Sequence, residues 1–260
     1  MDDFTGAAPE SAVGGEPATH LPPNPCTSCG ARAMCLGHTL TTRAEFGMPL
    51  IARKRVRSGE ALFRAGEPFH SAYAVRTGTF KTAVPFGDDR EQVTAFHLQG
   101  ELMGLDGLAV GEHAGSAYAL EDAEVCCLPY TLISDAAREA RDLRQELWSR
   151  LAVEMLREQE LATLLATTRA EARVAAFLLY LAGRMKARGY SSREFYLRMS
   201  RADIGSYLGI TVETVSRALS AFAEQGLIYV HKKHIRILDA EGLAREGPEA
   251  MTLRVFETQA

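Results

Sequence analysis

The stretch from Ser134 to Thr167 contains neither glycine nor proline and is rich in Ala, Leu, Glu and Arg. These residue types favour helix, so the sequence predicts one long helix here. Six side chains recur along it at spacings that alternate between three and four residues: Trp148, Leu151, Met155, Glu158, Ala162 and Leu165. This spacing is typical of a coiled-coil seam of about three heptads and implies a partner helix. The alternative is an amphipathic helix that packs on its own domain.

Residues 51–129, ahead of that helix, show the pattern of short β-strands. Alternating runs such as Phe80, Thr82 and Val84 stand between turns that contain glycine, for example Thr77-Gly78. Many short strands with glycine at the corners are typical of an antiparallel β-roll or jelly roll. With a helical region behind the strands, the sequence predicts an α+β fold whose N-terminal part is the roll.

Cysteines stand in two widely separated places. Cys26, Cys29 and Cys35 lie in a short loop flanked by proline and glycine, and Cys126 lies about ninety residues further on. Four thiolates drawn from a flexible loop and one distant strand are a known way to hold a [4Fe–4S] cluster or a structural zinc ion. Because one ligand is remote, loss of the metal would release the loop from the body of the protein. That property suits a sensor.

The fourth ligand has two candidates, because Cys126 and Cys127 are adjacent. Neighbours on a strand point to opposite faces, so only one of them can face the loop. Cys127 shares its face with Val125, which we expect to look inward, and Cys126 shares its face with Glu124. This favours Cys126 as the ligand, with Cys127 as a buried apolar thiol.

The C-terminal part has the pattern of two short helices joined by a tight turn. Ser200 and Asp203 form a capping box that opens a helix ending near Leu208, and Thr211 caps a second helix that runs to about Gln225. This arrangement predicts a helix-turn-helix. Residues 227–230 and 235–238 then predict a β-hairpin, a wing with a basic tip at 231–234.

The second helix carries polar side chains suited to reading bases. Glu213, Ser216 and Arg217 lie at i, i+3 and i+4, so they share one face of its first turns. Arg can grip guanine with two hydrogen bonds, Glu can accept from cytosine, and Ser can bond either way. The alternative is a solvated helical face with charge pairing.

Composition limits the remaining possibilities. The 260 residues are 47% hydrophobic and 24% charged, which suits two modest soluble domains. The apolar stretch Val174–Gly183 is about half the length of a membrane span. The first 25 residues carry no Lys or Arg and no apolar run, so we expect a cytoplasmic location, where cysteines bind metal more often than they form disulfides. Net charge is −4, but residues 191–238 hold seven Lys/Arg against four Asp/Glu, a balance of +3 that suits phosphate.

Together these residues resemble the FNR branch of the CRP/FNR family of bacterial transcription regulators, from Cys26 to about Asp239. The most specific pieces are the cysteine spacing, Gly100-Glu101-Leu102, the helix 170–177 and the run Thr211 to Arg217. The resemblance implies a β-roll sensor domain, a dimerisation helix and a C-terminal winged helix-turn-helix. It also implies an oxygen-labile [4Fe–4S] cluster, a homodimer when the cluster is bound, and double-stranded DNA with TTGAT-like half-sites as the target.

The implied division of the chain is a disordered tail at 1–25, a cluster-binding cysteine loop at 26–40, the roll at 41–134, the dimerisation helix at 135–167, the DNA-binding domain at 168–240 and a C-terminal tail at 241–260. Alignment with the family also selects Cys126 as the fourth ligand. The hairpin tip around Phe86, Gly87, Asp88 and Asp89 matches a loop that touches RNA polymerase in the family, although an ordinary exposed turn explains it equally well.

Two departures separate the chain from the cyclic-nucleotide branch. Where that branch has an Arg-Ser pair that grips the cyclic phosphate, this chain has Gly115-Ser116, so we expect no cyclic nucleotide. Before the Glu of the recognition helix that branch has Arg, whereas this chain has Val212, which can pack on a thymine methyl.

Glu158 suggests how dimerisation is controlled. Near a two-fold axis it would meet its own copy, so we expect it to oppose dimerisation until the cluster forms; the alternative is a solvated charge. Rival readings are a zinc-stabilised regulator and a regulator that senses a small molecule or haem. An iron–sulfur enzyme would need convergent acid and base groups, and the sequence shows no such constellation, so we expect no catalytic activity.

Overall fold

The computed structural model describes residue 26 and residues 28–42, 51–87 and 90–248. The predicted tail at 1–25, the end of the predicted C-terminal tail at 249–260, and Asp88 and Asp89 lie outside the described residues.

The N-terminal domain is an antiparallel β-roll, as predicted. One sheet has the strand order β1-β8-β3-β6 and the other β2-β7-β4-β5. The strands are β1 (Arg53–Val56), β2 (Ala61–Phe63), β3 (Ser71–Thr77), β4 (Phe80–Pro85), β5 (Glu91–His97), β6 (Leu102–Met103), β7 (Ser116–Ala119) and β8 (Ala123–Pro129). Short helix α2 (Gly107–Val110) follows β6. Alternate residues such as Phe80 and Val125 are fully buried between the sheets, where they form the core of the roll.

The cysteine loop folds onto the outside of this roll. It contains a 3-10 turn, η1 (Arg32–Met34), and helix α1 (Leu36–Thr42). Leu36 and Leu40 are fully buried and pack with Leu128 of β8 and with the helices that follow the roll. Burial of these apolar side chains fixes the end of the loop to the sheet that carries Cys126.

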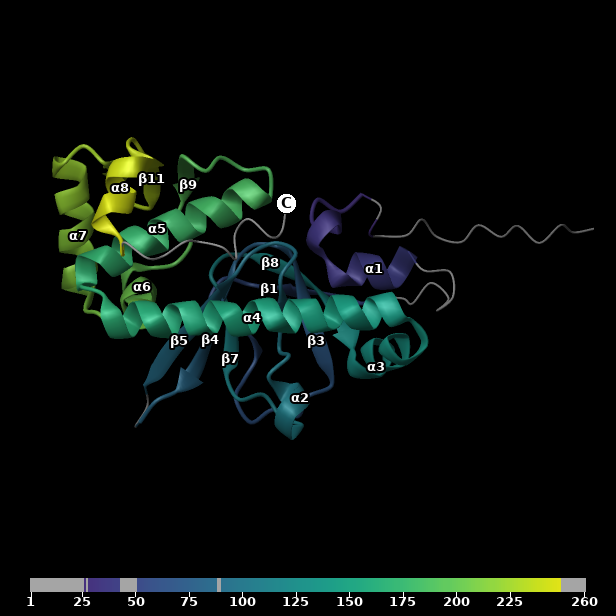
Figure 1. The fold of residues 1–260 in the computed structure, drawn as a ribbon. Coiled ribbons are helices and arrows are strands. Elements are labelled where there is room, and N and C mark those ends of the chain that lie inside the picture. The colour runs from purple at the N-terminus through teal and green to yellow at the C-terminus, as the bar shows by residue number, and fades with distance from the viewer. Residues whose placement is uncertain (1–25, 27, 43–50, 88–89, 249–260) are drawn as a thin grey trace, which may run out of the picture.

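The prediction of one unbroken helix over 135–167 is wrong at Ala140. The chain forms α3 (Tyr130–Glu139) and α4 (Arg141–Thr167), with Ala140 extended between them. Ala136, Ala140 and Leu143 are all buried against the roll. A straight helix could not lay both segments on the curved surface, so tertiary packing overrides a local preference for helix. From this break α4 runs along the roll to the C-terminal domain (Figure 1).

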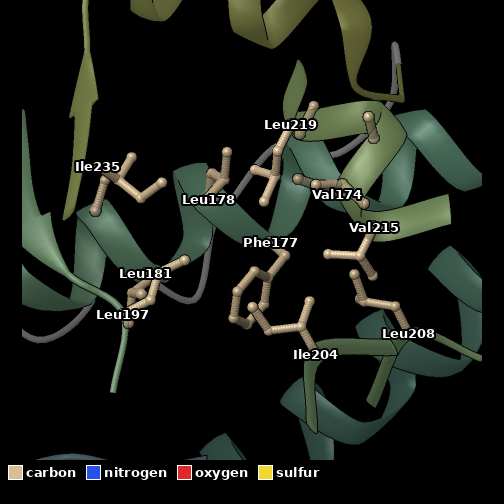
Figure 2. Packing of buried hydrophobic residues seen from close by; sticks show 14 of the residues in the cluster. Val174, Phe177, Leu178, Leu181, Leu197, Ile204, Leu208, Val215, Leu219 and Ile235 are labelled. Atoms are coloured by element: carbon tan, nitrogen blue, oxygen red, sulfur yellow. The ribbon is translucent and has the colours of Figure 1, made fainter. Parts of the chain in front are cut away.

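The C-terminal domain is built around helix α5 (Ala170–Ala187), whose Phe177, Leu178 and Leu181 point into its core (Figure 2). Its other elements are β9 (Glu194–Tyr196), α6 (Arg201–Leu208), α7 (Val212–Glu224), β10 (Ile228–His231), β11 (His234–Ile237) and α8 (Ala240–Glu246). The strands form one antiparallel sheet in the order β10-β11-β9. The predicted helix-turn-helix is therefore α6 and α7, with the β10–β11 hairpin behind it.

Helix α8 corrects the prediction of a tail from residue 241. Asp239 caps this helix by accepting a hydrogen bond from the Gly242 backbone at 2.9 Å, and Leu243 is fully buried in the domain core. The helix has only one buried leucine, too short a pattern to show helical periodicity in the sequence.

The two domains share part of one hydrophobic core. Phe96 of β5 contacts Phe177 of α5 and Tyr207 of α6, with ring centroids 5.9 and 5.2 Å apart. Lys81 of β4 reaches across to Asp203 of α6, with 2.6 Å between Nζ and Oδ1. The position of the DNA-binding domain is therefore tied to the roll. Within the described residues, no helix is long and apolar enough to cross a membrane.

Candidate functional site: a thiol pocket and a nucleic-acid interface

The structure brings the four predicted cysteines to one pocket. Cys26, Cys29, Cys35 and Cys126 all line it, and Cys127 does not. The register of β8 explains the difference. Val125 is fully buried inside the roll, so Cys126 points to the opposite face, toward the loop.

Backbone hydrogen bonds shape the loop around its thiols. The Cys29 amide donates to the Cys26 carbonyl at 3.1 Å, and the Arg32 amide donates to the Cys29 carbonyl at 3.2 Å. The His38 amide donates to the Cys35 carbonyl at 3.0 Å, at the start of α1. Consecutive turns of this kind hold three cysteine side chains on the inside of a short curve.

Burial favours the neutral form of two thiols of the pocket, Cys35 and Cys126. Burial raises the pKa of Cys35. Burial and then the neighbouring thiols raise the pKa of Cys126 to about 12. Three arginines, Arg32, Arg53 and Arg76, also line the pocket. Four thiolates would gather here only with a group that supplies positive charge, such as metal ions.

The donor set suits a sulfur-ligated group. The four side chains that converge are thiols, which are the ligands of iron–sulfur clusters and of structural zinc. Among the described residues, no three His, Cys, Asp or Glu side chains are grouped so as to hold a metal ion. The cysteines line a common wall without meeting at one point.

The predicted base-reading residues lie together on the first turns of α7. Val212, Glu213 and Arg217 are exposed, and Ser216 is half-buried beside them. On the opposite face Val215, Leu219 and Phe222 are buried in the domain core. The Thr211 side chain caps the helix by accepting from the Thr214 amide at 3.2 Å. The N-terminal end of α7 is thus a rigid, exposed platform.

The structure adds Arg201, which the sequence analysis did not single out. This exposed residue opens α6, and its Nη1 donates to the Ser216 hydroxyl at 2.9 Å. The contact brings a fifth side chain to the base-reading face. The sequence signal for Arg201 was its position directly after the capping Ser200. At that position a cation lies beside the second helix of the helix-turn-helix.

The predicted wing hairpin is present, but its turn is shorter than predicted. Its strands are β10 and β11, and the turn between them is only Lys232-Lys233. Lys232 has a φ of 55°, a conformation that tight two-residue hairpins require. His231 and His234 are therefore paired strand residues and not part of the tip. The two lysines remain the basic end of the wing.

The predicted seam of α4 is not covered by its own chain. Trp148 and Met155 are 65% and 64% exposed. Glu158 and Ala162 are also exposed, and Leu151 and Leu165 are half-buried. The opposite face of α4 packs on the protein through buried Leu143 and Leu164. Most of the seam therefore does not pack on its own domain, whereas Leu151 and Leu165 are partly covered by it.

The structure also describes the predicted hairpin tip at Phe86 and Gly87 and the Gly115-Ser116 pair. Phe86 is 62% exposed at the tip of the β4–β5 hairpin, beside Gly87. Ser116 is buried, and its hydroxyl accepts a hydrogen bond from the Ala65 amide at 3.1 Å. A side chain added at the neighbouring Gly115 would come within 2.7 Å of the Ala83 carbonyl oxygen.

The chain matches two known domain families and several known regulatory proteins. Residues 53–139 match the cyclic nucleotide-binding domain family, and residues 172–246 match the Crp-like helix-turn-helix domain family. The chain is 40% identical to the anaerobic regulatory protein of Haemophilus influenzae over 84% of this chain and 86% of that protein. It is 38% identical to the fumarate and nitrate reduction regulatory protein of Escherichia coli K12 over 85% of this chain and 89% of that one.

A solved structure is similar over most of its length. The structure of FixK2 from Bradyrhizobium japonicum matches with a TM-score of 0.71 and 32% identity, covering 77% of this chain and 99% of that chain. The match includes both domains and the helix between them.

Proposed function

The chain belongs to the CRP/FNR family of DNA-binding transcription regulators, and we propose that it is an oxygen-responsive member controlled by a [4Fe–4S] cluster. Cys26, Cys29, Cys35 and Cys126 would be its ligands. The single observation that carries this proposal is the convergence of three loop thiols and one strand thiol on one pocket. The name of one relative, an anaerobic regulatory protein, supports oxygen as the signal.

When bound, the cluster supplies an oxygen-labile link of four iron–sulfur bonds between loop and roll. The positions of the four cysteines determine which parts of the chain this link would order. Three ligands sit in the loop and the fourth in β8, so binding draws the loop onto the roll. Arg53 and Arg76 offset the negative charge of the thiolates. Without the fourth bond, the loop keeps the apolar contacts of its α1 end and hydrogen bonds such as the one from Arg150 Nη1 to the Met34 carbonyl at 2.8 Å.

Dimerisation is the step that gives affinity for DNA. One recognition helix offers few base contacts, whereas two helices about 34 Å apart reach successive major grooves on one face of DNA. The exposed seam on α4 is the surface that a second copy would cover. We infer that the ordered loop favours this pairing, and that the paired α7 helices read a TTGAT-like palindrome with Val212, Glu213, Ser216 and Arg217. The exposed Phe86 hairpin supports a contact with RNA polymerase at the promoter.

Cysteine variants purified without air test the ligand set. Wild type and Cys127→Ser should each hold four iron and four sulfide per chain and absorb visible light, because Cys127 does not line the pocket. Cys126→Ser should lose the cluster. The Cys127→Ser protein is the matched control, since the same change is made one residue away. Full iron content in Cys126→Ser would contradict the proposal, and a colourless wild type that holds zinc would replace it with a structural metal site.

A further inference from the structure

We propose that the turn Gln99–Glu101 is a relay within one subunit, which passes the state of the thiol pocket to the DNA-binding domain through Arg188. The inference rests on the proposed function, because it concerns how cluster binding is read out. It adds a route that does not run through the dimer seam. Arg188 and Glu101 are positioning residues in this route, and neither touches DNA.

One side of the turn is pressed by the cysteine loop. Gly100 has a φ of +88°, and a side chain added there would lie 3.3 Å from Met34 Cβ and 3.6 Å from Ala31 Cβ. A side chain added at Gly30 would lie 3.4 Å from the Gln99 amide nitrogen. Glycine at position 100 leaves room for the Met34 and Ala31 side chains of the loop to lie directly beside the turn. Any shift of the loop is therefore felt at Gly100.

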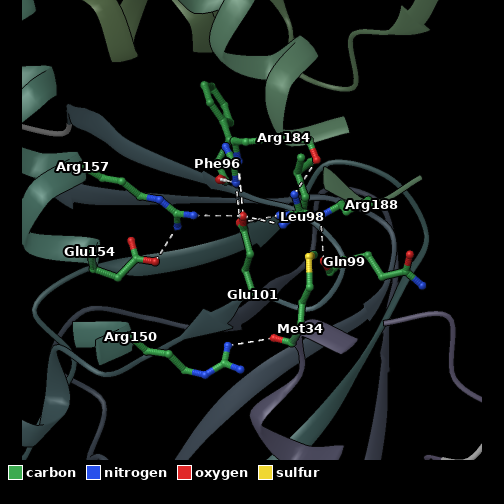
Figure 3. A network of polar contacts seen from close by, with 10 residues as sticks. All are labelled: Met34, Phe96, Leu98, Gln99, Glu101, Arg150, Glu154, Arg157, Arg184 and Arg188. Carbon is green, nitrogen blue, oxygen red and sulfur yellow. Dashed lines mark hydrogen bonds and ion pairs between the residues drawn. The ribbon is translucent and has the colours of Figure 1, made fainter. Parts of the chain in front are cut away.

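The other side of the turn is held by arginines of the helices. The buried Glu101 carboxylate accepts from Arg188 Nη2 at 2.6 Å and from Arg184 Nε at 3.2 Å, both donors from the end of α5 (Figure 3). Arg157 Nη2 of α4 lies 3.8 Å from the same carboxylate. One side chain of the turn thus joins the dimerisation helix to the first helix of the DNA-binding domain.

Gln99 strengthens the same connection. Its carbonyl accepts from Arg188 Nε at 2.8 Å, and its side-chain amide donates to the Arg76 carbonyl at 3.0 Å. Arg76 lines the thiol pocket. Arg188 therefore grips both ends of the turn, one through a carbonyl and the other through the Glu101 carboxylate.

The network resists gradual deformation. Burial alone would raise the pKa of Glu101, but Arg184, Arg188 and Arg157 outweigh it and hold that pKa well below its usual range. Removing one partner from a buried ion pair leaves a charge without compensation, which is costly. The turn and the end of α5 consequently move as one unit. Because α5 carries the core on which α6 and α7 pack, a shift of the turn re-aims the recognition helix.

The test compares Arg188→Met with Lys186→Met in the full-length chain. Both changes remove one positive charge near the end of α5, but Lys186 is exposed while Arg188 holds the turn. Arg184 and Arg157 remain to neutralise Glu101 in Arg188→Met, which protects folding. Five quantities are measured without air and after air: iron and sulfide content, dimer fraction by sedimentation, affinity for a TTGAT palindrome, affinity for the same half-sites moved apart by one base pair, and affinity for a palindrome with scrambled half-sites.

We expect Arg188→Met to keep its cluster and its cluster-dependent dimer. Its affinity for the preferred palindrome should fall at least tenfold, and its discrimination between the two spacings should fall with it, while preference for TTGAT over a scrambled half-site is retained. Lys186→Met should match wild type. Unchanged spacing discrimination in Arg188→Met would overturn the relay, as would joint loss of cluster, dimer and half-site preference, which marks a merely structural role. A wild-type chain that takes up no iron and sulfide would overturn the proposed function itself, and the relay with it.

Discussion

In the proposed complex with DNA, the side chains at the start of α7 would divide base reading among them by their chemistry. Arg217 is exposed and makes one weak local contact, with Nη2 3.3 Å from the Thr214 hydroxyl. It is therefore free to form two hydrogen bonds to guanine. Glu213 can accept from the paired cytosine, and Val212 can pack on a thymine methyl.

Arg217→Ala should weaken binding to the palindrome by roughly 1–3 kcal/mol per half-site and relax the preference at the G·C pair, because the bidentate contact is lost. Binding is measured on the TTGAT site, on the same site with that pair replaced, and on random DNA. Lys233→Ala serves as a control, because the loss of a phosphate contact should weaken binding to all three DNAs by the same factor. Equal loss on every DNA in Arg217→Ala would rule out direct reading at this position.

Glu101 gives a second prediction, about acid stability. Its folded pKa is depressed, so its contribution to stability is present above the ordinary carboxyl pKa near 4.3 and is lost as the pH falls below it. Glu101→Gln should lower the free energy of unfolding at pH 7 by about 3–5 kcal/mol, because Arg184 is left without its anion. Its deficit relative to wild type should stay nearly constant down to about pH 5 and shrink as the pH falls below the ordinary carboxyl pKa.

Urea unfolding at pH 7 and at pH 3 measures this difference. A Glu101→Gln deficit that is as large at pH 3 as at pH 7 would contradict the role assigned to the carboxylate.

Helices and strands were predictable where their signals are local. The capping box of α6 is present as predicted, with the Asp203 amide donating to the Ser200 hydroxyl at 3.0 Å and the Ser200 amide donating back to the Asp203 carboxylate at 2.8 Å. The break at Ala140 was not predictable, because no glycine or proline marks it and its cause is contact with the roll.

The two faces of α4 also differ in how well the sequence predicted them. The seam was visible in the spacing of its residues, and the exposed Trp148 and Met155 agree with it. The inner face also has a repeat, but its charged members Arg150 and Arg157 gave no sign of burial in the sequence. Their partners, Met34 and Glu101, come from segments far away in the chain.

Glu158→Ala should allow dimerisation in air. In a dimer two Glu158 carboxylates about 7 Å apart would repel by roughly 2–3 kcal/mol at an effective dielectric near 20, and less where water reaches them. Sedimentation of the aerobic protein measures the dimer fraction. Glu139→Ala removes the same charge from an exposed site on α3 and should stay monomeric. If the Glu158→Ala protein is also monomeric in air, this residue does not control dimerisation.

For the protein as a whole, the sequence predicted which domains follow one another better than it predicted the contacts between those domains. The roll, the long helix and the helix-turn-helix each carry their own pattern. The convergence of the cysteines could be expected from strand alternation, which places Cys126 and Cys127 on opposite faces. The hub around Glu101 could not, because buried ion pairs between distant segments leave no periodic signal. Arg184 lies within an apolar helix and is matched to its partner only by the tertiary fold.

An air titration of the anaerobic protein tests the cluster, the dimer and DNA binding in one experiment. Visible absorbance, dimer fraction and binding to a TTGAT palindrome are followed in the same samples as oxygen is added. We predict that all three fall together, with DNA binding lost at least tenfold once the absorbance is gone. DNA binding that persists unchanged after the iron–sulfur absorbance has disappeared would contradict the account.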